Sequence, residues 1–191
     1  KDTVPHLFHF NAFVMLGNGE KARMGSISAD YGHYAEWLKL DEADKRDEML
    51  PMEALLKIVC DKRRFLDLFE NYILFADTAN GPAKILAKNH QFLGVNRAVD
   101  AVRDRKRLDG KLGVFWHTQG SGKSFSMAFF TQKVHRKLGG DFTFLVLTDR
   151  TDLDNQIYKT FASVGLANND VDLCRAASAK GLRDLLSQQK R

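Results

Sequence analysis

The chain has 191 residues, of which 44% are hydrophobic and 28% are charged, and its formal net charge is +5. These values are ordinary for a packed domain and exclude a chain that is disordered along its whole length. The charge is uneven, because residues 84–137 hold 12 basic and only 3 acidic side chains. Such a block predicts a polyanionic partner, either nucleic acid or nucleotide phosphates, unless it is a solvated helix face.

The longest strand-like apolar run, Phe142 to Leu147, is far shorter than the roughly 20 residues of a membrane span, so no membrane partner is expected. Two cysteines, Cys60 and Cys174, cannot build a disulfide framework or a zinc site alone. Their small number favours a reducing, cytoplasmic setting.

The N-terminal part of the chain predicts a hairpin followed by helices. Residues 7–16 are rich in aromatic and β-branched side chains, a turn follows at Gly17–Gly19, and the return strand is expected at 22–27. Apolar side chains recur at helical spacing within 33–70, and residues 72–75 predict a short strand.

A turn cluster at 78–82 marks the predicted boundary between two units, 1–82 and 83–191. After residue 89, helices and strands alternate. Helices are expected at about 91–106, 123–138, 152–162 and 178–189, and strands at 113–117, 142–148 and 171–174. This alternation predicts an α/β fold in which crossover helices join a parallel sheet.

The segment His117–Ser124 has the sequence of a phosphate-binding loop between a strand and a helix. Glycines there let backbone N–H groups surround phosphates, and the helix N-terminus adds partial positive charge. Lys123 is the expected catalytic residue, reaching the β and γ phosphates, and the Ser124 hydroxyl is expected to ligate Mg²⁺. His117 replaces the first glycine of the motif, which helicase-type motors tolerate. A glycine turn with an incidental lysine is the alternative.

The loop and its flanks resemble the motor (R) subunit of type I restriction enzymes. The similar stretches are 7–27, 88–99, 114–124 and 147–156. The resemblance implies a RecA-like superfamily 2 motor domain within 83–191, preceded in 1–82 by an α+β hairpin-and-helix segment from the end of the nuclease region. It also implies a subunit that uses ATP and Mg²⁺ to translocate and cleave double-stranded DNA, together with methyltransferase and specificity subunits.

Site residues follow from the loop and from this resemblance. The expected ATP-binding residues are Gln91, Thr118, Gln119, Gly120, Ser121, Gly122, Lys123 and Ser124. The resemblance assigns adenine recognition to Gln91, and a polar helix residue near an N-cap at Asn89 is the alternative. The candidate DNA contacts are Arg103, Arg105, Lys106, Arg107 and Arg150, although a solvated helix end explains the first four equally well.

Other residues have expected structural roles. Phe115 and Trp116 are expected in the core, and Thr151 with Asp154 has the spacing of a capping box. The histidines at 90, 117 and 135 lack the spacing of a metal site.

No acidic pair that could position Mg²⁺ and water follows the loop, and the nuclease carboxylates are also missing. The chain is therefore expected to be an internal fragment that binds ATP without turning it over. Two alternatives remain. One is part of a stand-alone superfamily 2 helicase or translocase, and the other is a non-catalytic nucleotide- or DNA-docking module.

Overall fold

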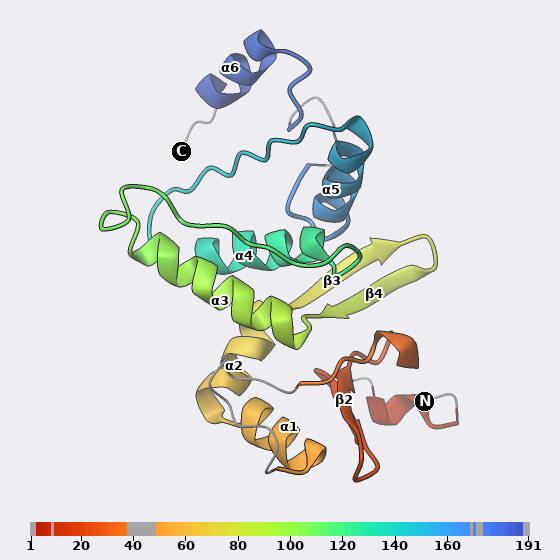
Figure 1. Cartoon of the computed structure of the whole chain (residues 1–191). Coiled ribbons are helices and arrows are strands. Elements are labelled where there is room, and N and C mark those ends of the chain that lie inside the picture. Colours follow the sequence, from red (N-terminus) through yellow and green to blue (C-terminus); the bar gives the residue numbers. More distant parts are fainter. Residues whose placement is uncertain (1–2, 9, 38–48, 169, 171–173, 189–191) are drawn as a thin grey trace.

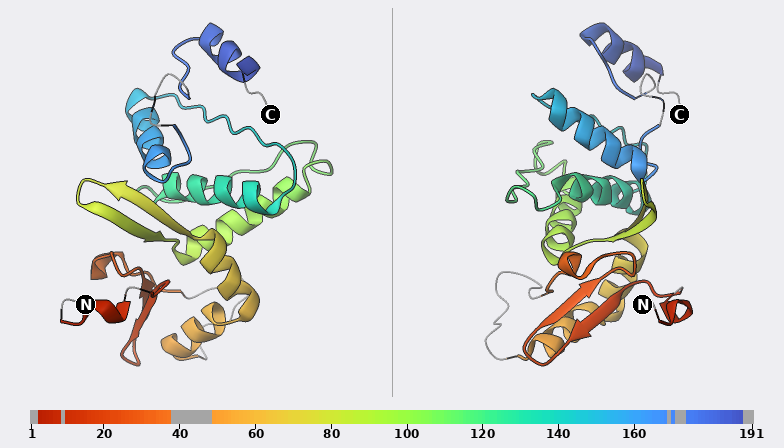
Figure 2. Two further views of the ribbon diagram at one scale, coloured as in Figure 1. Left: turned by 180° about the vertical axis from the view of Figure 1, so that it is seen from behind. Right: turned by 90° about the vertical axis from the view of Figure 1, so that its right-hand side faces the viewer.

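The computed structural model describes residues 3–8, 10–37, 49–168, 170 and 174–188. Along the chain they form η1 (Pro5–Phe8), β1 (Val14–Gly17), β2 (Ala22–Gly25), η2 (Tyr31–His33), α1 (Pro51–Val59), α2 (Lys62–Asn71), β3 (Ile73–Thr78), β4 (Gly81–Leu86), α3 (Asn89–Arg103), α4 (Lys123–Lys137), α5 (Thr151–Ser163) and α6 (Ala179–Gln188). Helices α3 and α4 lie side by side across the middle of the molecule. The elements from β1 to α2 lie on one side of them, and α5 and α6 lie on the other (Figure 1 and Figure 2).

The predicted N-terminal hairpin is confirmed, with a shorter first strand. β1 and β2 pair antiparallel, and Val14 lies opposite Gly25. In the turn, Gly19 has a φ of +88°, a left-handed conformation that glycine adopts without strain. Because β2 ends at the partner of Val14, the ladder stops there, and residues 5–8 form η1 instead of the predicted strand.

The long helical prediction is confirmed as two separate helices, α1 and α2. Asp61 separates them, because its side chain accepts a hydrogen bond from the backbone N–H of Arg64 at 3.1 Å and so caps α2. Before α1 the helical prediction is wrong at Ala35, which forms a β-bridge with Met24. Positions 38–48 of the predicted helical region lie outside the described residues.

The strand expected at 72–75 is confirmed as β3. β4, which the sequence analysis does not predict, pairs with it antiparallel, so that the turn cluster forms the tip of a second hairpin. At that tip the hydroxyl of Thr78 donates to the carbonyl oxygen of Gly81 at 2.7 Å. β4 begins with Gly-Pro and lacks alternation of apolar and polar side chains, which hides it from pattern analysis. The division of the chain at residue 82 stays a prediction.

The four helices expected after residue 89 are confirmed as α3 to α6. The parallel sheet is absent from the described residues, where both two-stranded sheets are antiparallel. Residues 113–117 and 142–148 have no regular secondary structure and join neither sheet, and Figure 1 shows them as extended traces beside α4. Positions 171–173 are not described. In doubly wound sheets consecutive strands need not be neighbours, so these two segments need not pair with each other.

The exposure of the first extended segment follows from its missing sheet neighbours. Val114 is 95% exposed and Trp116 is 77% exposed. The expectation that Trp116 lies in the core is therefore wrong for this structure, and Phe115 is only partly covered. Among the described residues, no helix is both long and apolar enough to cross a membrane.

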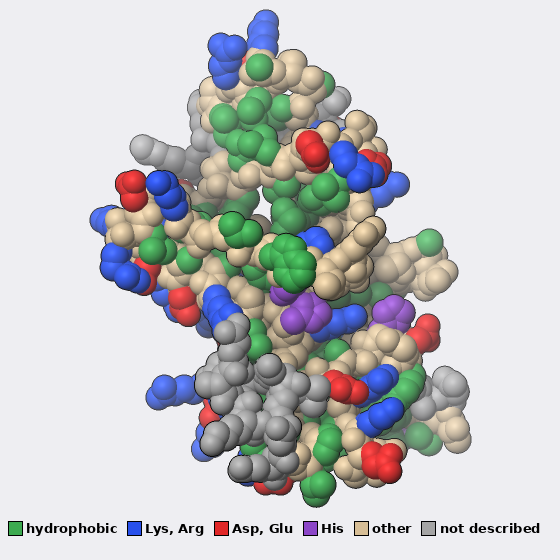
Figure 3. Space-filling view, viewed as in Figure 1, with side chains coloured by type: hydrophobic (Ala, Val, Ile, Leu, Met, Phe, Trp, Pro, Cys, Tyr) green, Lys and Arg blue, Asp and Glu red, His purple; other side chains and the backbone are tan. Residues whose placement is uncertain are grey.

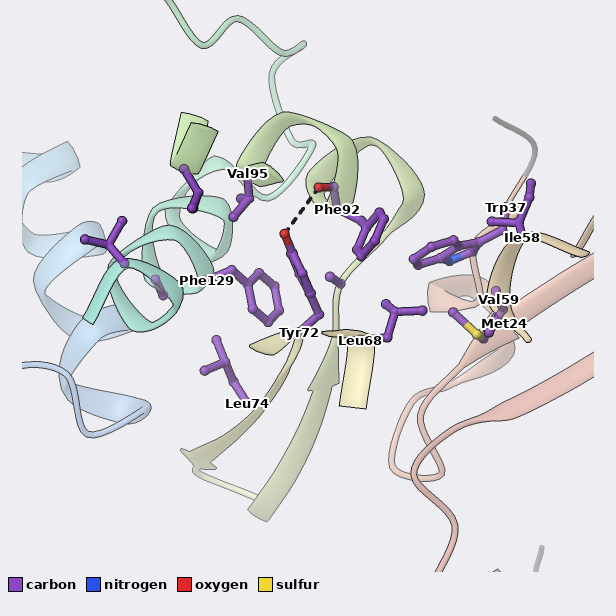
Figure 4. Packing of buried hydrophobic residues seen from close by; sticks show 14 of the residues in the cluster. Met24, Trp37, Ile58, Val59, Leu68, Tyr72, Leu74, Phe92, Val95 and Phe129 are labelled. Carbon is purple, nitrogen blue, oxygen red and sulfur yellow. Dashed lines mark hydrogen bonds between the residues drawn. The ribbon is translucent and has the colours of Figure 1, made fainter. Parts of the chain in front are cut away.

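One apolar core connects the N-terminal elements to α3 and α4 (Figure 4). Tyr72, fully buried, lies at its centre, with its ring centroid 4.7 Å from that of Phe92 and 5.8 Å from that of Phe129. On the far side of Phe92, the ring of Trp37 lies 5.5 Å away. Burial of these large aromatic side chains therefore stabilises both parts of the chain together.

A polar network, here called the Lys133 network, crosses this core and consists of Asp67, Asn71, Tyr72, Asn96 and Lys133. Asn71 belongs to it because its amide nitrogen donates to Asp67 at 2.9 Å. The Lys133 ammonium group donates to both carboxylate oxygens of Asp67 at 2.6 Å and to the side-chain oxygen of Asn96 at 2.5 Å. Tyr72 donates to the same Asn96 oxygen at 2.7 Å. Burial lowers the pKa of Lys133, and the hydrogen bond and charge of Asp67 oppose that effect. The network fixes α2 and α3 against α4.

Candidate phosphate-binding site

The loop between the extended segment and α4 has the backbone geometry on which the phosphate-loop prediction depends. Gly120 and Gly122 have φ angles of +76° and +85°, a region that other residues rarely adopt. Gly122 is the N-cap of α4, and no side chain caps this helix end. The N–H groups of the first helical turn are therefore available to an external anion, which the helix dipole also favours.

Lys123 is the first residue of α4, and its side chain folds back over the loop. Its ammonium group donates to the carbonyl oxygens of His117 at 2.9 Å and Thr118 at 3.0 Å. The charge therefore lies within the curve of the loop, where a phosphate group would compete for it. Ser124 follows as a half-buried residue, and Thr118 and Gln119 are exposed at the loop tip.

The first turn of α3 contacts the loop through Gln91, which is 4% exposed. Its amide nitrogen donates to the carbonyl oxygen of Gly122 at 2.9 Å, and its amide oxygen accepts from the backbone N–H of Lys88 at 2.8 Å. The N-cap of α3 is Lys88 and not Asn89. Both ends of the Gln91 amide thus have partners within the chain, and adenine recognition by this residue stays a prediction.

Two polar atoms near the loop are buried without a hydrogen-bond partner, His117 Nδ1 and Ser121 Oγ. Such atoms are rare in folded proteins. Burial lowers the pKa of His117, and the nearby charges of His90 and Lys123 lower it further. A bound triphosphate would offer the Ser121 hydroxyl an acceptor, so the residues present fit this group.

The site is also compatible with the Mg²⁺ ion that accompanies ATP. The described part of the chain contains no cluster of three or more His, Cys, Asp or Glu side chains that could hold a metal ion. Ser124 offers one hydroxyl at the start of α4. One protein oxygen suits Mg²⁺, which commonly keeps several waters and binds substrate phosphates.

The predicted DNA contacts of the basic block are Arg103, Arg105, Lys106 and Arg107. Arg103 pairs with Asp100 at 2.6 Å, and Arg107 pairs with Asp104 at 2.6 Å. Arg105 donates to a backbone carbonyl at 3.0 Å. These ion pairs neutralise part of the block, as a solvated helix end would, and DNA contact by these residues stays a prediction.

Arg150 lies directly before α5 and pairs with Asp152 at 2.5 Å. It is also the N-cap of α5, with no side-chain cap, so the capping box expected for Thr151 and Asp154 is wrong. Asp154 instead pairs with Arg175. The side chain of Arg150 is 68% exposed, which leaves it accessible to a phosphate only if the Asp152 pair opens.

A hollow of about 840 Å³ lies apart from the loop. The extended residues 142–147 form one wall, and side chains of α5, α6, residues 166–168 and 174–179, and Thr131 of α4 line the remainder. It shares no lining residue with 117–124, so the phosphate-loop geometry is independent of this hollow.

Two residues of this region have roles that the sequence did not lead us to expect. The ring of His90, considered above only as a metal ligand, lies against the loop. Lys133 is buried on the same face of α4 as Ser126 and Phe129, and its helical spacing from these two residues was the signal in the sequence that it faces the core.

Known proteins share this part of the molecule. Residues 90–191 match the family model described as SWI2/SNF2 ATPase, which covers more than half of the chain. The endonuclease subunit of the type I restriction enzyme HindI from Haemophilus influenzae is 37% identical over 171 residues, or 85% of this chain.

Two further relatives are putative type I restriction enzyme endonuclease subunits of Methanocaldococcus jannaschii. MjaIXP is 26% identical over 184 residues, or 84% of this chain, and MjaVIIIP is 26% identical over 192 residues, or 97% of this chain. The chain spans only 16–18% of the length of the three relatives. These findings confirm the resemblance expected from the sequence: the chain belongs to the SWI2/SNF2 ATPase family and is related to endonuclease subunits of type I restriction enzymes.

Proposed function

We propose that the chain provides the ATP-binding phosphate loop of the R subunit of a type I restriction enzyme, a subunit that translocates and cleaves double-stranded DNA. The observation that carries this proposal is the uncapped N-terminus of α4 behind two glycines with positive φ, with Lys123 folded over the loop. The relatedness to type I restriction endonuclease subunits narrows the choice among ATPases.

With ATP bound, Lys123 would pair with the β and γ phosphates in place of the carbonyl oxygens of His117 and Thr118. The N–H groups at the start of α4 would donate to phosphate oxygens. Ser124 would offer its hydroxyl to Mg²⁺, and Ser121 would donate its otherwise unpaired hydroxyl. Bound ATP supplies the phosphoryl group whose transfer to water drives translocation.

We further propose that residues 113–117 and 142–148 are strands of a RecA-like parallel sheet. Both segments are extended, and both expose apolar side chains, with Leu147 79% exposed. A central strand of a parallel sheet is apolar on both faces, because helices cover each side of the sheet. The pattern of these segments agrees with that position.

The proposed partners are duplex DNA and the methyltransferase and specificity subunits. Lys106 and Arg150 are the first proposed DNA contacts to test, because both are exposed near the ends of helices, although Arg150 must first open its pair with Asp152. Replacing one lysine or arginine that contacts a DNA phosphate with a neutral residue should reduce the slope of log K against log salt concentration by about one.

The proposal is tested by ATP binding to the chain, followed with a fluorescent ATP analogue and Mg²⁺. Lys123→Ala should weaken binding about 10- to 100-fold, since a hydrogen bond to a charged group contributes about 1.5–3 kcal/mol. Lys111→Ala, which removes an exposed lysine just before the loop, is the matched control and should have no effect. Equal affinity of the two variants would refute the proposal.

The R-subunit assignment needs a second measurement. ATP hydrolysis by the R subunit that carries these residues should require the methyltransferase and specificity subunits and unmethylated duplex DNA. Hydrolysis on any DNA without those partners would favour a stand-alone translocase. Turnover by the chain alone would contradict the expectation that it binds ATP without hydrolysing it.

A further inference from the structure

We propose that His90 is a positioning residue of the phosphate loop, which it holds through the Ser121 carbonyl and the His117 ring. This inference rests on the proposed ATP-binding function and names a residue outside the loop that sets its shape. His90 is the second residue of α3 and lies 31 positions before Ser121 in the sequence.

The first contact is a hydrogen bond. Nε2 of His90 lies 3.1 Å from the carbonyl oxygen of Ser121. A carbonyl oxygen only accepts, so this ring nitrogen carries the hydrogen and donates it. The bond is partly buried, and water therefore competes with it less than at an open surface.

The second contact is made by the ring itself. The centroids of His90 and His117 are 4.7 Å apart, with the ring planes at 85° to each other. On its other side His117 meets Phe115, at 4.5 Å between centroids. His117 is thus held between two rings at the position where the motif usually has glycine. In the space-filling view, histidine side chains gather near the middle of the molecule, beneath an apolar side chain (Figure 3).

The next residue of α3 makes a parallel contact, because Gln91 donates to the carbonyl of Gly122 at 2.9 Å. Two consecutive loop carbonyls are therefore directed at the first turn of α3. In a planar trans peptide the C=O and the following N–H point in opposite directions. The helix α4 itself also holds the Gly122 carbonyl, through the Ser126 N–H at 3.0 Å, so the hold that α3 adds alone is the one on the Ser121 carbonyl. That hold turns the N–H group of Gly122 away from α3, where it can donate to an anion.

A second contact between α3 and α4, from Lys133 to Asn96, holds the first turn of α3 against the loop. Asn96 of α3 accepts from Lys133 of α4 at 2.5 Å and from Tyr72 at 2.7 Å, so a shift of α3 along the axis of α4 would break these bonds. The position of His90 and Gln91 along α4, and therefore relative to the loop, is fixed in this way. The contacts of His90 are with the loop backbone and the His117 ring, which makes it a positioning residue.

The test compares His90→Leu, His90→Gln and His135→Leu in the R subunit that carries these residues. Affinities for ATP and for inorganic tripolyphosphate are measured by competition with a fluorescent ATP analogue. His90→Leu should weaken both about tenfold, because it removes the donor to Ser121. His90→Gln places an amide N–H near the position of Nε2 and should stay within about threefold.

His135 is exposed near the far end of α4, so His135→Leu repeats the chemical change away from the loop and should leave both affinities unchanged. A merely structural role would lower the unfolding temperature of His90→Leu without changing the tripolyphosphate affinity, and that result would overturn the inference. Equal affinities for the Leu and Gln variants would overturn it as well.

Lys123→Ala distinguishes a failure of the proposed ATP-binding function from a failure of the positioning role of His90. If Lys123→Ala loses ATP binding and His90→Leu does not, only the positioning role fails. If Lys123→Ala binds ATP normally, the proposed function fails first. Should His90→Leu not fold, His90→Asn replaces it, because its shorter amide cannot reach Ser121, and tenfold weaker binding is again the expected result.

Discussion

The Lys133 network allows a sharp test of how the N-terminal elements support the loop-bearing helix. The side chain of Lys133 is 6% exposed, and its partner Asp67 is 24% exposed. Asp67→Ala leaves the ammonium group buried without its counter-charge, which should cost about 3–5 kcal/mol of unfolding free energy. For a chain of this size that loss corresponds to a fall of roughly 6–20 °C in Tm.

Removal of the other partner, Lys133, is expected to cost less unfolding free energy. Lys133→Met fills the space with an apolar side chain and leaves Asp67 partly solvated, while Asn96 keeps the Tyr72 hydrogen bond. A loss of about 1–3 kcal/mol follows. In the double variant neither charge is stranded, so its cost should fall short of the sum by about 1–3 kcal/mol.

Urea unfolding followed by circular dichroism measures these energies. Glu70→Ala provides the matched control, because Glu70 pairs with Lys137 between the same two helices but at the surface. Its loss should cost no more than about 1 kcal/mol. The reasoning would be refuted by equal costs for Asp67→Ala and Glu70→Ala, or by strict additivity of the Asp67 and Lys133 changes.

Three further predictions concern the loop. Gly122→Ala should destabilise the chain by about 1–2 kcal/mol and weaken ATP binding, because φ is +85° and the new Cβ would lie 2.9 Å from the Gln91 amide nitrogen. Gly120→Ala has a similar φ but open space around it, so binding assays and urea unfolding should show the smaller loss there. Gln91→Ala should cost about 1–3 kcal/mol, because it removes two partly buried hydrogen bonds, one from the Lys88 N–H and one to the Gly122 carbonyl, and an unchanged urea midpoint would count against this. The pKa of His117, measured by NMR titration, should lie below its ordinary value of 6.5 and rise in His90→Gln, since His90 contributes to the shift. A depressed pKa means that the unfolded chain binds the proton more readily, so the stability linked to His117 is complete above pH 6.5 and falls as the pH drops below it.

Local patterns in the sequence predict the helices of this chain well. The boundaries of α4 follow from the glycine loop to within a residue, and α5 begins within a residue of its expected start, whereas α3 begins two residues and ends three residues earlier than expected. The first hairpin is also visible, because its turn has the sequence Gly-Asn-Gly. These elements depend on hydrogen bonds between residues close together in the chain.

Features that depend on distant residues were not predictable in the same way. The pairing of Lys133 with Asp67 joins residues 66 positions apart, and nothing in either helix alone specifies it. The contact between Gln91 and Gly122 likewise spans 31 positions. The absence of a parallel ladder in the described residues has the same origin, because a strand needs a partner that its own sequence does not name.

The continuous core has a consequence for synthesis on the ribosome. Asp67 is made 66 residues before Lys133, and Tyr72 is made well before Phe129. At a translation rate of about 5–20 residues per second, the N-terminal elements wait on the order of 3–13 s before α4 arrives. During that interval the faces of Trp37 and Tyr72 that α3 and α4 later cover are open to solvent and to chaperones. Slow codons between β4 and α4 would lengthen this exposure, and faster ones would shorten it.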